Sequence, residues 1–389
     1  MFRCGLATLI VFAAVTSTAF GGGKQTKKLP VTAEGWVEFM EKAKKPRTRA
    51  IVALILAEKF GGDESCVFPA LKQRLFQDKE PEVRKAAAVG LSVVGPKVGR
   101  ADGKAIALVL AKAMLEDKAK EVRQTAAEAL AGKMVQYGED VVTSLAQALK
   151  DDHAGTRAAA ARVLKEMGKK ARLVRDKIVV VVKSKNLDRF TRLYLVQTLT
   201  MFHQTDEDVE KILPILKAAL SETDPPEGLQ QIVIDGLPNY GEKANVAVAE
   251  VLAIFKKPSN PPLLRRSAAI TLGKMNPSQG ETWKAVQEVL SEDRGDLHAE
   301  AIRLSGQFCQ AEKGFVEQMI KMCGQGNQEA KLAAIHELER LGAKAEPALD
   351  TLKDLASNAV REIVRMQASK ALEVVSKALA AEKKDKKKK

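Results

Sequence analysis

A leucine returns along the chain at intervals of 32 to 39 residues, and each one closes a similar short segment. The ten positions are Leu56, Leu91, Leu130, Leu164, Leu199, Leu237, Leu272, Leu304, Leu338 and Leu372. A period of this length is typical of solenoids, in which one repeat cannot bury its apolar face without neighbours. The spacing therefore predicts a single array of about ten stacked units.

The segments around these leucines predict that each unit is a pair of helices. An Arg stands seven residues before most of the leucines, and small residues such as Ala87 and Ala88 stand four and three residues before them. These offsets fall on one helical stripe, where small side chains let a neighbouring helix approach closely. A Gly follows four residues after the leucine in four units, at Gly95, Gly168, Gly241 and Gly342, where a positive φ would end the helix. Another apolar helix precedes each leucine helix, so we expect an all-α fold, an α-solenoid of about ten helical hairpins.

The repeated motif resembles a known family. It runs Pro-Ala-Leu, a helix, an Asp, then Val-Arg, Ala-Ala and Leu, and it is clearest in residues 68–95, 108–130 and 145–168. It resembles the HEAT-repeat family, closest to the short HEAT-like repeats of the phycobilisome-lyase type, here in an exported bacterial-type protein. Tetratricopeptide repeats have a similar period, but their aromatic positions are missing from a chain with 4% aromatic residues.

The resemblance implies a structural ladder between stacked units. Its members are an Asp in the turn between the two helices and the Arg that begins the second helix. In this sequence the two stand six residues apart, as Asp78 with Arg84, Asp117 with Arg123, and Asp151 with Arg157. Charge-assisted hydrogen bonds at this edge would fix the orientation of neighbouring units. Gln230 replaces the Arg that would follow Asp224, so the ladder is expected to weaken there.

The two ends of the chain differ from the repeats. Residues 1–19 are typical of a signal peptide, with Arg3, an apolar stretch over residues 6–15 that is shorter than the roughly 20 residues of a membrane span, and Ala19 at the cleavage site. We expect export and cleavage, which leaves a periplasmic or secreted protein. A flexible basic linker is expected over 20–31, the HEAT-like solenoid over 32–380, and a disordered Lys-rich tail over 381–389.

The net charge of +14 is concentrated towards the ends. Residues 24–49 and 383–389 each carry +5, whereas residues 50–382 carry only +3. Nucleic-acid binders usually place their basic residues on the folded surface that docks. Electrostatic binding of a polyanion or an anionic membrane surface therefore stays an alternative, through the termini. The lysines of the tail that would make such contacts are Lys383, Lys384, Lys386, Lys387, Lys388 and Lys389.

No residue pattern predicts a catalytic, cofactor or metal site. The four histidines fall in four different units, without a second His or a Cys at metal-ligand spacing. The pair His336-Glu337 is similar to the iron-binding pairs of the deoxyhypusine hydroxylases, but that family needs several pairs. Cys309 and Cys323 allow either a disulfide or two buried thiols. We expect a protein that is not an enzyme; a lyase-type activity is the enzymatic alternative, implied only by the name of the repeat subtype.

The resemblance implies that the second helices line a concave face. Polar residues that should point away from the buried stripe are Lys85, Gln124, Glu128, Arg162, Gln197, Gln231, Asp235 and Arg266. Their mixture of charges favours a protein or peptide partner over a uniform polyanion. We therefore expect a non-catalytic scaffold or protein-recognition module, without a small-molecule cofactor, although an ordinary solvated helix face would show the same polar residues.

Overall fold

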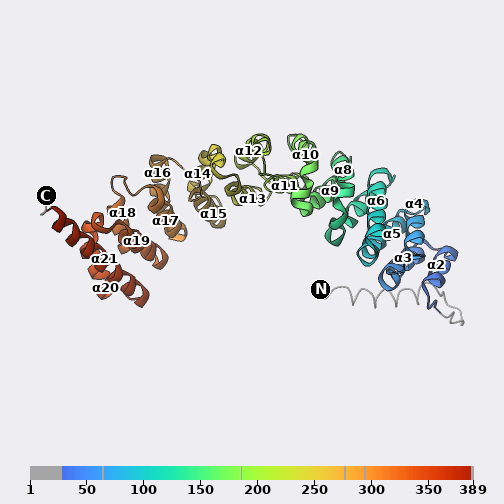
Figure 1. Ribbon diagram of the computed structural model, residues 1–389, viewed down its shortest axis with the longest axis horizontal. Coiled ribbons are helices and arrows are strands. Elements are labelled where there is room, and N and C mark those ends of the chain that lie inside the picture. Colours follow the sequence, from blue (N-terminus) through green and yellow to red (C-terminus); the bar gives the residue numbers. More distant parts are fainter. Residues whose placement is uncertain (1–28, 64, 185, 276, 293–294, 387–389) are drawn as a thin grey trace. The chain divides into compact units, whose positions relative to one another are not determined.

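The computed structural model describes residues 29–63, 65–184, 186–275, 277–292 and 295–386. Every regular element in these ranges is a helix, and none is a strand (Figure 1). The predicted all-α solenoid is therefore confirmed. The chain divides into two compact units, Met1–Phe202 and His203–Lys389, which are called unit 1 and unit 2.

Unit 1 contains five hairpins, each made of a first and a second helix. They are α2 (Ala33–Lys42) with α3 (Pro46–Phe60), α4 (Val67–Gln77) with α5 (Pro81–Val94), α6 (Arg100–Glu116) with α7 (Lys120–Ala129), α8 (Gly138–Ala148) with α9 (Ala154–Met167), and α10 (Arg175–Val182) with α11 (Arg189–Leu199). The 3-10 helices η1 (Gly95–Lys97), η2 (Gly132–Tyr137) and η3 (Gly168–Val174) connect successive hairpins.

Unit 2 repeats the same plan. Its hairpins are α12 (Asp206–Leu220) with α13 (Leu229–Gly236), α14 (Val248–Lys256) with α15 (Pro262–Leu272), α16 (Gln279–Leu290) with α17 (His298–Phe308), α18 (Phe315–Gln325) with α19 (Gln328–Leu341), and α20 (Leu349–Asn358) with α21 (Glu362–Lys386). Its 3-10 helices are η4 (Leu237–Ala247), η5 (Gly295–Leu297) and η6 (Gly342–Ala348).

Glycines mark the connections between hairpins in two different ways. Gly168, Gly241 and Gly342 have φ values of 57°, 56° and 56°, which a residue with a side chain rarely adopts. Gly95 does not follow the expected pattern, because its φ is −49° and α5 passes directly into η1. A glycine is needed here because it leaves room for the side chain of Met134: a Cβ at this position would lie 2.4 Å from the Met134 sulfur.

The repeated leucines lie at the centre of the array. Nine of the ten are buried, with at most 2% of the side chain exposed. Leu372 is half-buried, and Ala368, Ala371 and Val375 fill the buried stripe of α21 in its place. α21 is the last helix of the described residues, and no later hairpin among them packs against it.

The ends of the chain are described only in part. The predicted signal peptide and most of the predicted linker fall within residues 1–28, which lie outside the described residues. The tail differs from the expectation, because α21 continues to Lys386; residues 378–386 consist of Ala, Leu, Lys and Glu with one Asp, most of them strong helix formers. Lys387, Lys388 and Lys389 lie outside the described residues. Within those described, no helix combines the length and apolar character of a membrane span.

Candidate protein-binding surface

The second helices form one continuous face in each unit, called the second-helix face. Within unit 1, α4, α6 and α8 lie in one row and α5 and α9 in the other (Figure 1). The second helices approach one another more closely than the first helices do, in both units. A Cβ on Gly90 of α5, for example, would lie 3.3 Å from the backbone oxygen of Ala53 in α3. The more closely spaced row lies on the inside of a bend, so this face is the inner side of each unit.

An Arg at the start of the second helix links each of the first four hairpins of unit 1 to the next one. Nε and Nη2 of Arg84 donate to the carboxylate of Asp117 at 2.7 and 2.8 Å, and Nη1 donates to the backbone oxygen of Asp78 at 3.0 Å. The carboxylate of Asp78 in turn accepts from Arg49 of the preceding hairpin at 2.7 and 2.8 Å. The equivalent contacts are Arg123 with Asp151 and Arg157 with Asp188.

The predicted ladder residues therefore lie together at one edge of unit 1, but their pairing differs from the sequence expectation. Each predicted pair six residues apart meets through the backbone oxygen of the Asp, whereas the carboxylate binds the Arg of the hairpin before it. Sequence analysis missed Arg49 and Asp188, although Arg49 shares the repeated position seven residues before a leucine. The repeat spacing alone does not show which neighbour each Arg reaches.

Two carboxylates of the ladder, those of Asp78 and Asp151, have lowered pKa values. Burial would raise the pKa of Asp78, but the hydrogen bonds from Arg49 and from the backbone N–H of Glu80 outweigh it and lower the pKa overall. The pKa of Asp151 is lowered in the same way, against its burial, by Arg123 and the backbone N–H of His153. Both carboxylates are therefore held in their charged form at neutral pH.

The ladder is interrupted in unit 2 and then resumes. Gln230, which stands at the Arg position, donates to the backbone oxygen of Leu220 at 2.8 Å. A cavity of about 530 Å³ lies beside it, lined also by Glu250 and Asn260. At the next hairpin Arg265 donates to Glu292 at 2.8 Å and to the backbone oxygen of Phe255 at 2.7 Å.

The predicted partner-binding residues of unit 1 lie on second helices and are at least partly exposed. Lys85 lies on α5, Gln124 and Glu128 on α7, Arg162 on α9 and Gln197 on α11. Gln124 donates to Glu128 at 2.8 Å, and Arg162 lies 3.8 Å from Glu166. These contacts run along single helices, so a partner could replace them without disturbing the core.

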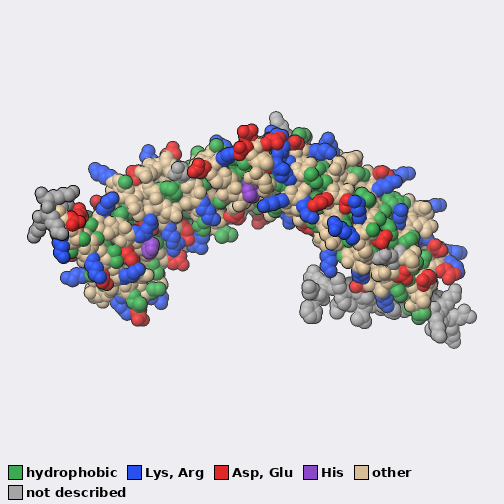
Figure 2. Space-filling view, in the orientation of Figure 1, with side chains coloured by type: hydrophobic (Ala, Val, Ile, Leu, Met, Phe, Trp, Pro, Cys, Tyr) green, Lys and Arg blue, Asp and Glu red, His purple; other side chains and the backbone are tan. Residues whose placement is uncertain are grey.

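The predicted residues of unit 2 are more strongly connected. Gln231 of α13 donates to Asp235 at 2.9 Å and to Ser267 of α15 at 2.7 Å. Arg266 of α15 contacts Glu300 of α17 at 3.0 Å. Figure 2 shows basic and acidic side chains intermingled on the visible surface, in agreement with the mixed charges of the predicted residues.

Sequence analysis did not identify the groove that crosses α17, α19 and α21. It has a volume of about 440 Å³ and is lined by Arg303, Gln307, Leu332, Ala333, His336, Glu337, Arg340, Ile363 and Gln367. These residues come from three successive second helices of unit 2. His336, which the sequence also shows as half of a His-Glu pair, lies in this groove with its Nδ1 3.7 Å from Glu337.

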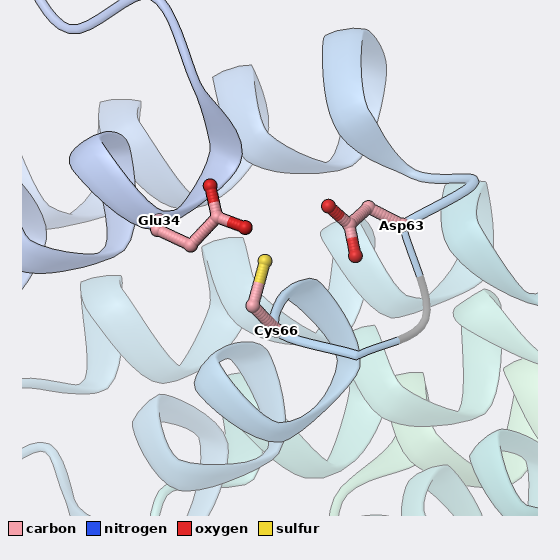
Figure 3. A group of neighbouring side chains, drawn as sticks. All are labelled: Glu34, Asp63 and Cys66. Atoms are coloured by element: carbon pink, nitrogen blue, oxygen red, sulfur yellow. The ribbon is translucent and has the colours of Figure 1, made fainter.

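Three possible metal ligands meet in unit 1 at the start of the array. The donor atoms of Glu34, Asp63 and Cys66 all lie within 4.8 Å of one another. Figure 3 shows the three side chains pointing toward one another. Burial raises the pKa of the Cys66 thiol, and the charges of Asp63 and Glu34 raise it further. Carboxylates and a thiolate are donors that zinc accepts, although no His completes the set. The sequence shows no metal-ligand spacing here, because Glu34 lies on α2 and the other two residues lie in the later connection between α3 and α4.

The other described cysteines are buried and have free thiols. They are Cys309, at the end of α17, and Cys323, within α18. Burial raises the pKa of each thiol to about 12. Both thiols are therefore protonated at neutral pH.

Comparison with known families identifies the repeats. Residues 33–131 and 107–176 match the family model for HEAT repeats. This part of the chain therefore consists of HEAT repeats, in agreement with the resemblance of the sequence motif. The finer resemblance to the phycobilisome-lyase type stays a prediction. No curated protein matches the chain.

Solved structures with the same fold are distant in sequence. The chain is similar to Kap95p in a structure concerning its binding to RanGDP, with a TM-score of 0.54, 14% identity, and coverage of 89% of this chain and 50% of that one. It is similar to Kap121p bound to Nup53p, with a TM-score of 0.52, 15% identity, and coverage of 96% and 44%. It is also similar to the karyopherin Kap121p bound to the extreme C-terminus of the protein phosphatase Cdc14p. Here the TM-score is 0.51, the identity is 14%, and the match covers 96% of this chain and 44% of that one. The chain thus spans half the length of these proteins or less, and the likeness concerns the fold.

Proposed function

We propose that this protein is an exported, non-catalytic scaffold that binds a protein partner along its second-helix face. The observation that carries the proposal is the row of exposed polar side chains contributed by successive second helices on the inner side of each unit. A surface repeated in this way offers many separate contacts to an extended partner. Mixed charges on such a face favour specific recognition of another protein.

The solved structures of the same fold support this proposal. Kap121p is bound to Nup53p in one of them and to a segment of Cdc14p in another. The resemblance concerns fold alone, so the partner of this chain is expected to differ. Export is proposed from the signal-peptide pattern of residues 1–19, and it would place the partner outside the cytoplasm.

The test compares two variants of equal charge. The first carries Lys85→Glu, Arg162→Glu and Arg266→Glu on the second helices α5, α9 and α15. The matched control carries Lys72→Glu, Lys177→Glu and Lys284→Glu on the first helices α4, α10 and α16, where all three lysines are exposed. Each purified protein captures partners from an extracellular or periplasmic extract, and the captured proteins are quantified by mass spectrometry.

We expect the second-helix variant to lose the partners that the wild-type protein captures and the control variant to keep them. Equal far-UV circular dichroism and melting curves show that both variants are folded. Equal capture by all three proteins would contradict the proposed face, as would equal losses in the two variants. A further variant that lacks residues 383–389 separates binding on the second-helix face from attraction of a polyanion to the basic tail. Only the attraction of a polyanion should be lost on this deletion.

A further inference from the structure

Three ion pairs on the second helices of unit 2 separate their charges by depth. In each pair the basic side chain is more exposed than the carboxylate. Arg303, Arg340 and Lys370 have exposed side-chain fractions of 57%, 45% and 63%. Their partners Glu300, Glu337 and Glu339 have 10%, 4% and 15%. A molecule that docks over these pairs therefore meets the basic groups before their carboxylates.

The contacts explain how the carboxylates hold the basic groups in place. Arg340 donates to Glu337 at 2.8 Å, and Lys370 lies 2.9 Å from Glu339. Glu300 lies 3.0 Å from Arg266 and 3.4 Å from Arg303. A guanidinium has five N–H donors, and these pairs leave donors on the exposed side of each group. The buried carboxylates thus orient the arginines without occupying their outer donors.

Apolar side chains lie beside these charges. Ile363 lines the groove across α17, α19 and α21, which is called the α17–α21 groove, and has 50% of its surface exposed. Met366, one residue before Gln367 of the groove wall, has 65% exposed. Lying one helical turn apart on α21, these two side chains offer adjacent apolar surface beside the charges. The groove therefore combines cationic groups with an apolar wall.

We infer that the α17–α21 groove binds an acidic peptide segment that carries an aliphatic side chain. Carboxylates of the peptide would accept from Arg303 and Arg340, which present planar donors suited to carboxylates. The aliphatic side chain would cover Ile363 and Met366. This inference rests on the proposed function and names the chemistry of its partner.

A peptide fits these observations better than a nucleic acid does. Nucleic-acid sites track phosphates with a continuous basic surface and stack bases mainly on Phe, Tyr or Trp, none of which lines the described part of the groove. Glu337 beneath the groove would also oppose a dense polyanion, whereas a peptide can alternate acidic and apolar residues.

Fluorescence anisotropy with the full-length chain tests the inference. The probe is a short labelled peptide that repeats Glu-Glu-Leu, compared with equal-length peptides that repeat Gln-Gln-Leu and Glu-Glu-Gly and with single-stranded DNA. We expect the Glu-Glu-Leu peptide to bind most tightly and its affinity to fall as salt is added. Replacing Arg303→Gln and Arg340→Gln should weaken its binding about tenfold or more.

A matched control carries Lys284→Gln and Lys321→Gln, which remove the same charge from the first helices α16 and α18 and should leave the affinity unchanged. Arg303→Gln alone is the second variant if the double variant does not fold, because Glu300 then keeps its contact with Arg266. The double variant Ile363→Ala, Met366→Ala should bind the Glu-Glu-Leu peptide more weakly than the wild-type protein does. Its affinity for the Glu-Glu-Gly peptide should be unchanged.

Any of the following results would overturn the inference. The neutral peptide could bind as tightly as the acidic one, or the control variant could lose as much affinity as the arginine variant. DNA could bind more tightly than the peptide and depend on the same arginines. A dimer in sedimentation velocity that the arginine variant abolishes would identify a second copy of the chain as the occupant and also overturn it. If partners are captured through Lys85, Arg162 and Arg266 but acidic peptides do not bind, the inference fails while the proposed function stands.

Discussion

Gly306 of α17 and Glu337 of α19 face each other where two second helices pack together. A Cβ built on Gly306 would lie 2.1 Å from the carboxyl carbon of Glu337, so the absence of a side chain makes room for this buried carboxylate. Glu337 in turn holds Arg340 at 2.8 Å. One glycine thus fixes the position of a basic group on the surface of the neighbouring helix.

Gly306→Ala should displace Glu337 and destabilise the protein by about 1–3 kcal/mol, as overpacking of a close contact usually does. Gly324→Ala is the control, because no atom lies within 4 Å of the position of its Cβ in α18. That change should be neutral or stabilise the helix by up to about 1 kcal/mol. Urea unfolding of both variants measures the difference; similar destabilisation by the two would show that Gly306 has no special role.

Arg84→Ala should destabilise unit 1 by about 2–4 kcal/mol, because it leaves the nearly buried carboxylate of Asp117 without its two-nitrogen contact. Arg84→Lys keeps the charge but loses the planar pair of donors, so it should recover only part of the loss. The exposed neighbour Lys85→Ala should change the stability by less than about 0.5 kcal/mol. Chemical denaturation followed by circular dichroism measures all three, and an unchanged midpoint for Arg84→Ala would contradict the role assigned to the ladder.

The Arg–Asp contact that the ladder lacks at Gln230 can be introduced by mutation. In unit 1 Arg49, Arg84 and Arg123 each bind the Asp six residues before the next Arg, and the corresponding residue before Arg265 is Ser259. Gln230→Arg alone should not stabilise unit 2, whereas Gln230→Arg with Ser259→Asp should. A double-mutant cycle on thermal unfolding should give a favourable coupling of about 0.5–3 kcal/mol. Zero coupling would show that α13 and α15 are not spaced for the ladder geometry.

The ladder predicts a specific sensitivity to acid. The folded pKa values of Asp78 and Asp151 lie below the ordinary value of about 3.9. Their stabilising contribution is therefore fully present above pH of about 4 and is lost as the pH falls through the lowered folded values. Urea unfolding measured from neutral to acidic pH should show a smaller loss of stability at low pH for Asp78→Asn than for the wild-type protein. An identical pH profile would argue against the lowered pKa.

The described cysteines should differ in reactivity. Cys66 is half-buried and its pKa is raised by burial and by Asp63 and Glu34, so iodoacetamide should modify it slowly at neutral pH. Asp63→Asn removes one negative charge and should accelerate the reaction. Cys309 and Cys323, buried and with pKa values of about 12, should react only after unfolding. Mass spectrometry of the alkylated peptides measures each site, and fast labelling of Cys323 in the folded protein would contradict its burial.

The sequence by itself determined the helical hairpins, their number and their relationship to HEAT repeats. These properties depend on short-range periodicity: leucines and alanines at offsets of three, four and seven define a helical stripe, and the repeat length defines a hairpin. The assignment of the second helices to the inner face came from the family resemblance instead. The polar residues predicted to bind a partner lie on second helices, and their role stays a prediction.

The tertiary structure decided which residues meet between repeats. The carboxylate of Asp78 pairs with Arg49 rather than with Arg84, Gly95 makes room for Met134, and Glu34 of α2 joins Asp63 and Cys66. The depth of Glu337 beneath Arg340, and with it the positive surface of the α17–α21 groove, also arises only there. Sequence spacing defines the face of a helix on which a side chain lies. The distance and rotation between packed helices determine its neighbour and its burial, and these result from the packing of many side chains at once.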